Sequence, residues 1–275
     1  MKKQLAIGLA AMLGAVGASV FAGDEHGAEK PQMYTIYKEV VKPAMTEQYE
    51  DAMKYLISEF KEFQVDPEKV NWKAISGPEL GYVYVMPIEN WAGMDQMHAN
   101  WMEAIEAIGQ DRFQDIIAPA VEAMDHIEVF QVIRRNDLSY TPENPRLKPD
   151  EVKYIHYGFY YALPGKGEEL EAIAKEFVEL YKSKGIDTGW SLYQSVTGND
   201  LPLYVVAHGA KSLTDYYAHR EKLTEQVGEE GKKISAKVGA TVRKMEYKEG
   251  TLRPDLSYPE PTPYSAVKEK KEGTR

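Results

Sequence analysis

The sequence carries two copies of one pattern, and this internal repeat constrains the fold more than any other feature. When the chain is shifted by 121 residues, the segment 33–107 falls on 154–228 without a gap. The matched identities include Pro43/Pro164, Glu47/Glu168, Glu50/Glu171, Asp66/Asp187, Gly77/Gly198 and His98/His219. Near the end the shift becomes 118 residues, and Asp-Leu-Ser-Tyr closes both copies, at 137–140 and 255–258. A repeat of this length predicts two similar structural units in one chain.

Each copy predicts the same order of secondary structure. Residues 34–41 are rich in Tyr, Val and Ile, which is typical of a strand, and apolar residues recur at helical spacing after Pro43. Two short strands, a second helical region and a last alternating strand follow. The expected strands are 34–41, 71–76, 82–87 and 127–133 in the first copy and 153–163, 191–197, 203–207 and 241–247 in the second. Strand, helix, two strands, helix, strand is the ferredoxin-like plan.

The helices of one such sheet cover only one of its faces, so the other face needs a partner. Two copies in one chain meet that need by packing sheet-to-sheet. The predicted fold class is therefore α+β, with two tandem ferredoxin-like (βαββαβ) domains. This pattern resembles the dimeric α+β barrel superfamily, which includes antibiotic-biosynthesis-monooxygenase (ABM)-like, NIPSNAP-type and EthD-like domains. The resemblance is clearest at 91–98 and 212–219, where a helix with a histidine in its first turns follows an apolar strand. It implies an intramolecular barrel.

Composition divides the rest of the chain into tails and a linker. The segment between the copies is polar and rich in proline, as linkers are. The C-terminal segment mixes proline with lysine and glutamate, which is typical of disorder. The expected order is a signal peptide at 1–22, a polar tail at 23–32, a first domain at 33–140, a linker at 141–151, a second domain at 152–258 and a disordered tail at 259–275.

The N-terminal residues have the pattern of a secretory signal. Lys2 and Lys3 precede the apolar run 5–20, and small residues then predict cleavage after Ala22. The alternative is a membrane anchor, but this run is shorter than the about 20 residues that a spanning helix needs. We therefore expect a soluble exported chain, periplasmic or secreted and without a membrane anchor.

Charge and cysteine content exclude several function classes. The chain carries 43 acidic and 33 basic residues, for a formal net charge of −10, and it contains no cysteine. An acidic chain without a basic run is a poor partner for nucleic acid. The lack of cysteine removes disulfides, thiolate nucleophiles and thiolate metal sites. The expected partner is a small apolar or aromatic ligand, and the expected state is a monomer or a weak homo-oligomer.

Two histidines stand at equivalent places in the repeat. His98 and His219 each lie near the start of the second helix of a copy, where they could bind a ligand, act as acid or base, or simply cap a turn. In haem-degrading relatives a helical histidine binds iron, with an asparagine on the first strand. The first strands here, 34–37 and 154–157, hold no asparagine. No cofactor is expected, and haem is disfavoured.

Aromatic residues on the strands indicate a ligand pocket inside the barrel. The candidate lining residues share strand positions and a ring that can contact an apolar molecule; they are Tyr34, Trp72, Tyr84, His156, Tyr193 and Tyr204. The alternative is that these rings fill the interior. His156 and His208 occur only in the second copy, as a site in one diverged half would require, although a lone strand histidine is more often structural.

Acidic pairs repeat on the first helix of each copy. Glu47 with Glu50, and Glu168 with Glu171, are expected to be solvated residues that favour the positive end of the helix. No nucleophile elbow, phosphate loop or zinc motif is present. Three functions stay open: a protein that binds an aromatic molecule, an ABM-like cofactor-independent monooxygenase acting on one, or a structural protein with a filled barrel.

Overall fold

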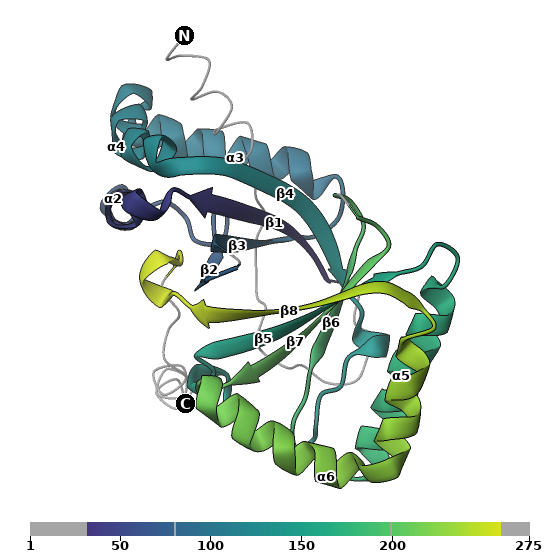
Figure 1. The fold of residues 1–275 in the computed structure, drawn as a ribbon. Helices are drawn as coiled ribbons and strands as arrows, with labels where there is room; N and C mark the ends of the chain where they lie inside the picture. Colours follow the sequence, from purple (N-terminus) through teal and green to yellow (C-terminus); the bar gives the residue numbers. More distant parts are fainter. Residues whose placement is uncertain (1–31, 80, 199, 260–275) are drawn as a thin grey trace, which may run out of the picture.

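A computed structural model describes residues 32–79, 81–198 and 200–259 as a closed eight-stranded antiparallel barrel (Figure 1). The predicted signal peptide, and nearly all of both predicted tails, lie outside the described residues. Among the residues described, no helix has the length and apolar character needed to cross a membrane. The α+β class and the tandem ferredoxin-like plan predicted from the repeat are confirmed.

The first half follows the expected order with one addition. Its elements are β1 (Gln32–Val41), α2 (Thr46–Glu62), β2 (Lys73–Gly77), β3 (Gly81–Ile88), α3 (Gly93–Ile108), α4 (Gln110–Ala123) and β4 (Met124–Arg134). The second helical region is thus two helices, because Gly109 adopts a φ of 93° and breaks the chain direction between them. All three helices cover the outer face of the sheet.

The second half repeats this plan with a single, longer last helix. Its elements are β5 (Tyr154–Ala162), α5 (Gly167–Ser183), β6 (Ser191–Ser195), β7 (Leu203–Ala210), α6 (Leu213–Val238) and β8 (Val242–Leu252). A kink at Gly228, where φ is 58°, divides α6 and lets it pass over the sheet toward α5. Figure 1 shows α5 and α6 standing along the outer side of this sheet.

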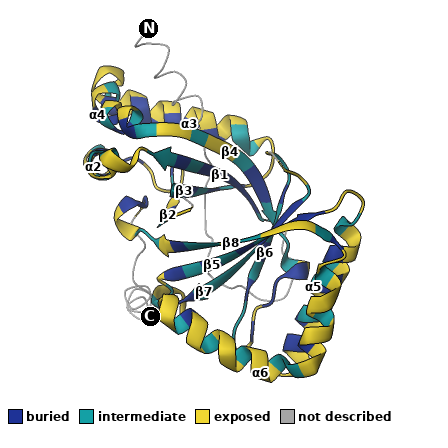
Figure 2. Ribbon diagram, viewed as in Figure 1, coloured by how far each residue is buried: buried dark blue, intermediate teal, exposed yellow. Residues whose placement is uncertain are grey.

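The two sheets join at both edges, in the order β1-β3-β2-β8-β5-β7-β6-β4. Side chains alternate along every strand, so each strand presents one row to the barrel interior and one row to the helices. The interior row is apolar and aromatic, and it includes Tyr34, Ile36, Phe130, Val132, Tyr193 and Val205. Figure 2 shows this arrangement as buried and intermediate strands within helices whose outer faces are exposed.

The last turn of each half packs against the other half. Tyr258 forms a bridge with Trp72, and Tyr140 forms the equivalent bridge with Trp190. Each indole Nε1 donates to a carbonyl of the exchanged turn, Trp72 to Leu256 at 2.7 Å and Trp190 to Leu138 at 3.1 Å. The repeated Asp-Leu-Ser-Tyr is therefore the segment that closes the partner half. The structure also matches Trp72 with Trp190, an offset of 118 residues, so the gap-free shift of 121 does not hold at the second strand of each half.

Two arginines complete this exchange by clamping the repeated glutamates. Arg253 holds Glu50 with Nη–Oε distances of 2.5 and 2.7 Å, and Arg135 holds Glu171 at 2.9 and 2.8 Å. Hydrogen bonds from Arg253 lower the pKa of Glu50 to about 2. The expectation that these two glutamates are solvated is wrong, because their helices begin beside the closing turn of the other half.

We expect the clamp to contribute measurably to stability. The substitution Glu50→Gln should lower the free energy of unfolding at pH 7 by about 2 kcal/mol, because Arg253 loses its charged partner. Since the folded pKa of Glu50 lies below its ordinary 4.5, this contribution is complete above pH 4.5 and is lost as the pH falls toward about 2. Denaturant unfolding at several pH values measures both effects.

The matched control is Glu179→Gln, which breaks an exposed pair with Lys182 on α5. An exposed pair of this kind should change the unfolding free energy by less than about 0.5 kcal/mol. Equal effects of the two substitutions would contradict a structural role for the clamp.

Candidate functional site

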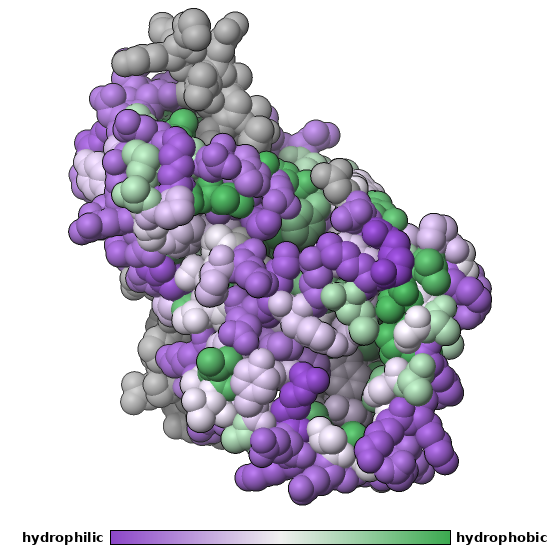
Figure 3. Space-filling view, viewed as in Figure 1, coloured by the Kyte–Doolittle hydropathy of each residue, from purple (hydrophilic) through white to green (hydrophobic). Residues whose placement is uncertain are grey.

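A cavity of about 300 Å³ lies in the second half, between its sheet and the helices α5 and α6. It is on the outer face of the sheet and not in the barrel interior, where the sequence predicted a pocket. The space-filling view shows a hollow in the surface of this half (Figure 3). Inside the barrel, the rings of Tyr34 and Tyr193 meet edge-on at a centroid distance of 6.0 Å.

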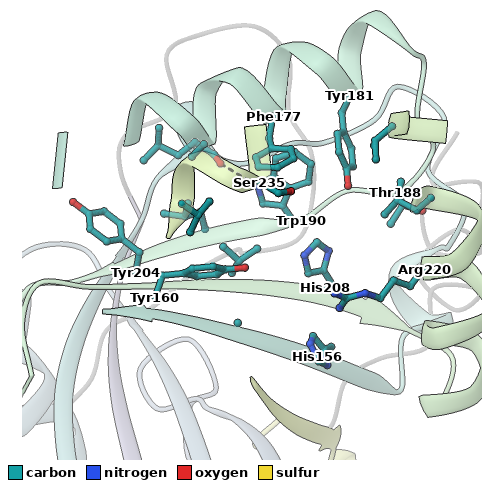
Figure 4. A pocket seen from close by; sticks show the side chains of 18 of the residues that line it. His156, Tyr160, Phe177, Tyr181, Thr188, Trp190, Tyr204, His208, Arg220 and Ser235 are labelled. Atoms are coloured by element: carbon teal, nitrogen blue, oxygen red, sulfur yellow. Dashed lines mark hydrogen bonds between the residues drawn. The ribbon is translucent and has the colours of Figure 1, made fainter. Parts of the chain in front are cut away.

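Apolar and aromatic side chains form most of the cavity wall. Phe177 and Tyr181 come from α5, Trp190 precedes β6, and Leu223 and Val227 come from α6. Tyr181 meets Trp190 edge-on at a centroid distance of 4.5 Å. Figure 4 shows these rings gathered above the strands. A concave apolar wall with a few polar groups is the usual form of a site for a small molecule.

Polar groups converge on one part of the wall. His156 on β5 and His208 on β7 are direct partners in the strand register, so both rings point to the helices. Arg220 projects from α6 toward them, as Figure 4 shows, and its Nη1 donates to the Tyr216 hydroxyl at 2.9 Å. We call His156, His208 and Arg220 the polar cluster.

His156 is buried without a hydrogen-bond partner. Only 4% of the residue is exposed, and neither ring nitrogen has a partner in the described structure. The imidazole is stacked on Tyr216 at 4.3 Å and on Tyr247 at 5.6 Å. Buried polar atoms in folded proteins nearly always find a partner. An unpaired donor and acceptor at a cavity wall therefore point to a group supplied by a ligand.

Both strand histidines are held in the neutral form. Burial lowers the pKa of His208 to about 4, with a further lowering by His156 and by the positive charge of Arg220. Burial also lowers the pKa of His156. At neutral pH each ring therefore offers one N–H donor and one acceptor nitrogen.

Three of the residues selected from the sequence border this cavity: His156, Tyr204 and His219. Tyr34 and Tyr193 lie in the barrel interior, and Trp72 and Tyr84 lie in the helix-covered core of the first half. His98 is exposed on α3. The structure adds Arg220 and Trp190, and it places His208, which the sequence favoured as structural, in the polar cluster. A prediction of the register between the first and third strands of this half would have placed His156 beside His208 from the sequence alone.

In the described part of the first half, the corresponding space between sheet and helices is much smaller. Tyr37 stands where the second half has Gly158, and Trp101 from α3 stacks on Trp72 at 5.6 Å. Phe113 from α4 is fully buried against the same core. The space left there is about 40 Å³. In the second half Gly158 takes the place of Tyr37, and the space beside it borders the larger cavity.

Haem ligation by a helical histidine does not fit these residues. His98 is on the surface, and the Nε2 of His219 is hydrogen-bonded to the Thr188 hydroxyl. Nor does the described part of the chain gather three or more His, Asp or Glu side chains in a way that could hold a metal ion.

No protein-family model matches the sequence, and no curated protein matches it. The fold is similar to that of an anthrone oxidase-like protein (TM-score 0.51, 13% identity, 82% of this chain and 92% of the other covered). It is also similar to a candidate monooxygenase from Lactobacillus acidophilus (TM-score 0.50, 9% identity, 81% and 94% covered). Chlorite dismutase from Candidatus Nitrospira defluvii matches with a TM-score of 0.48 and 10% identity, covering 82% and 92%. The first two neighbours support the fold alone.

We expect the two strand histidines to resist protonation. In an NMR titration the His208 ring should show a pKa well below 6.5, whereas the exposed His126, whose pKa Asp125 raises, should titrate above it. Because the unfolded chain binds a proton at His208 more readily, this residue should destabilise the fold as the pH falls from 6.5 toward 4. Similar titration of both rings would contradict the buried, neutral assignment.

Proposed function

We propose that this protein binds a small aromatic or apolar molecule in the cavity of its second half. The observation that carries the proposal is a cavity of about 300 Å³ whose wall is mostly aromatic and aliphatic. This volume is at the lower end of the range for ligand sites, which suits a molecule of about two fused rings. The unpaired nitrogens of His156 support it, because buried polar atoms usually have a hydrogen-bond partner and these two border the cavity.

Two wider assignments accompany this proposal. We propose that the chain is a member of the dimeric α+β barrel superfamily, on the basis of the eight-stranded barrel and of the neighbours with that fold. We also propose that it is exported after cleavage behind Ala22. Native mass spectrometry of the protein expressed with residues 1–22 tests export and ligand retention together: the expected mass is that of the chain from Gly23, with a discrete adduct. Retention of residues 1–22 would contradict export.

Filling the cavity should abolish binding without unfolding the protein. Ala174 on α5 lines the cavity, so Ala174→Phe places a ring in the space that a ligand needs. We expect affinity for naphthalene-type probes, followed by quenching of Trp190 fluorescence, to fall at least about tenfold. The unfolding temperature should stay equal or rise, because added apolar contacts fill a void.

Ala172→Phe is the matched control, since Ala172 lies on the exposed side of the same helix. It should leave probe affinity unchanged. Equal affinity in the wild type and in both variants would contradict binding in this cavity.

The second candidate is oxygenation of the bound aromatic molecule without a cofactor. It is favoured by the polar cluster, since a neutral imidazole can accept a proton and Arg220 can stabilise the resulting anion. In the reaction an activated CH₂ between aromatic rings becomes a carbonyl. O₂ supplies the carbonyl oxygen, and its second oxygen atom leaves as water with the two CH₂ hydrogens.

An oxygen electrode with anthrone as the probe tests this candidate. We expect oxygen uptake above the buffer rate, reduced at least about tenfold in His156→Gln and unchanged in His126→Gln, whose histidine is exposed on β4. Uptake at the buffer rate would leave binding without catalysis.

A further inference from the structure

The charged residues around the cavity are compensated, with one exception. Among the described lining residues, Arg146 is paired with Asp215 at 2.8 Å and Glu171 is paired with Arg135 at 2.8 Å. Arg220 has no carboxylate within ion-pair distance in the described part of the chain, and its hydrogen bond goes to the neutral Tyr216 hydroxyl. Arg220 is an exposed residue, so its guanidinium is solvated in the free protein and can pair with a negative charge on a ligand at the edge of the cavity.

The groups that face Arg220 do not supply this charge. His156 and His208 come from the strands, Tyr216 comes from the same helix, and Tyr160 and Tyr247 come from β5 and β8. Burial lowers the pKa of both histidines and raises the pKa of Tyr160 and of Tyr216, so these four groups are neutral near pH 7. The Tyr247 hydroxyl adds a further hydrogen-bonding group. The described surroundings of Arg220 therefore consist of neutral hydrogen-bonding groups, and its acceptor, the Tyr216 hydroxyl, carries no negative charge.

His156 supplies the second, independent observation. Only 4% of His156 is exposed, and neither of its ring nitrogens has a hydrogen-bond partner in the described structure. Because it is the direct cross-strand neighbour of His208, both imidazoles and the Arg220 side chain border one corner of the cavity (Figure 4). One acceptor that carries negative charge would satisfy the unpaired donor and the unpaired cation together.

We propose that the polar cluster is an anion subsite, and that the ligand of this cavity is a planar aromatic carboxylate. The guanidinium fork matches the two oxygens of a carboxylate, and the remaining lone pairs accept from the imidazole N–H groups. The ring system then lies against Phe177, Tyr181 and Trp190. This inference rests on the proposed function, and it adds the charge and the orientation of the ligand.

The test compares 2-naphthoate with 2-naphthamide, which has nearly the same shape and no charge. In calorimetric titrations at pH 7 the wild type should bind the carboxylate at least about tenfold more tightly than the amide. Arg220→Gln should remove this preference by weakening naphthoate binding alone, and Arg220→Lys should keep part of it. Arg243→Gln, which removes a positive charge on β8 that is paired with Asp200, should leave both affinities unchanged.

The outcomes separate this inference from the proposed function. Equal affinity for both probes in the wild type and in Arg220→Gln would overturn the anion subsite, while the binding function would stand. A preference lost equally in Arg220→Gln and Arg243→Gln would assign it to net charge and would also overturn the subsite. Binding of neither probe to the wild type would contradict the proposed function itself, and the subsite with it. Circular dichroism confirms that each variant is folded.

Discussion

The closing turn of each half completes the core of the other half, and the barrel depends on this exchange. An indole hydrogen bond fixes each turn, and an arginine beside it clamps a glutamate at the start of the opposite half's first helix. Glu50 and Arg253 are about 200 positions apart in the sequence. Glu171 and Arg135 form the equivalent ion pair at the other seam. The strand pairs β2–β8 and β4–β6 close the same two seams. Neither half is therefore complete without its neighbour.

Much of this fold could be predicted from the repeat, because the order of strands and helices follows from local periodicity. The exchange of the Asp-Leu-Ser-Tyr turns between the halves could not be predicted, because the motif is equally compatible with packing inside its own half. The role of Glu50 and Glu171 was hidden for the same reason. An acidic residue in a first helical turn looks solvated until the arginine that faces it comes from a distant segment.

The site was harder to predict. Strand alternation divides the side chains of a strand into two rows, but it does not say which row faces the helices and which faces the barrel interior. His156 and Tyr204 lie on strands as expected, yet they border the outer cavity, while Tyr34 and Tyr193 occupy the interior. Arg220 carries no signal in the sequence. It matters only because no carboxylate in the described structure approaches it, and that is a property of the folded arrangement.

The unequal filling of the two halves has a consequence for how such a protein can change over time. In a symmetric pair of identical chains every substitution occurs twice, so a hollow and its histidines would weaken both cores at once. With both copies encoded in one chain, Trp101 and Phe113 can keep one core solid while Gly158 and His156 open the other. The packed half maintains the stability of the fold, so substitutions that reshape the cavity in the other half carry less risk to the barrel.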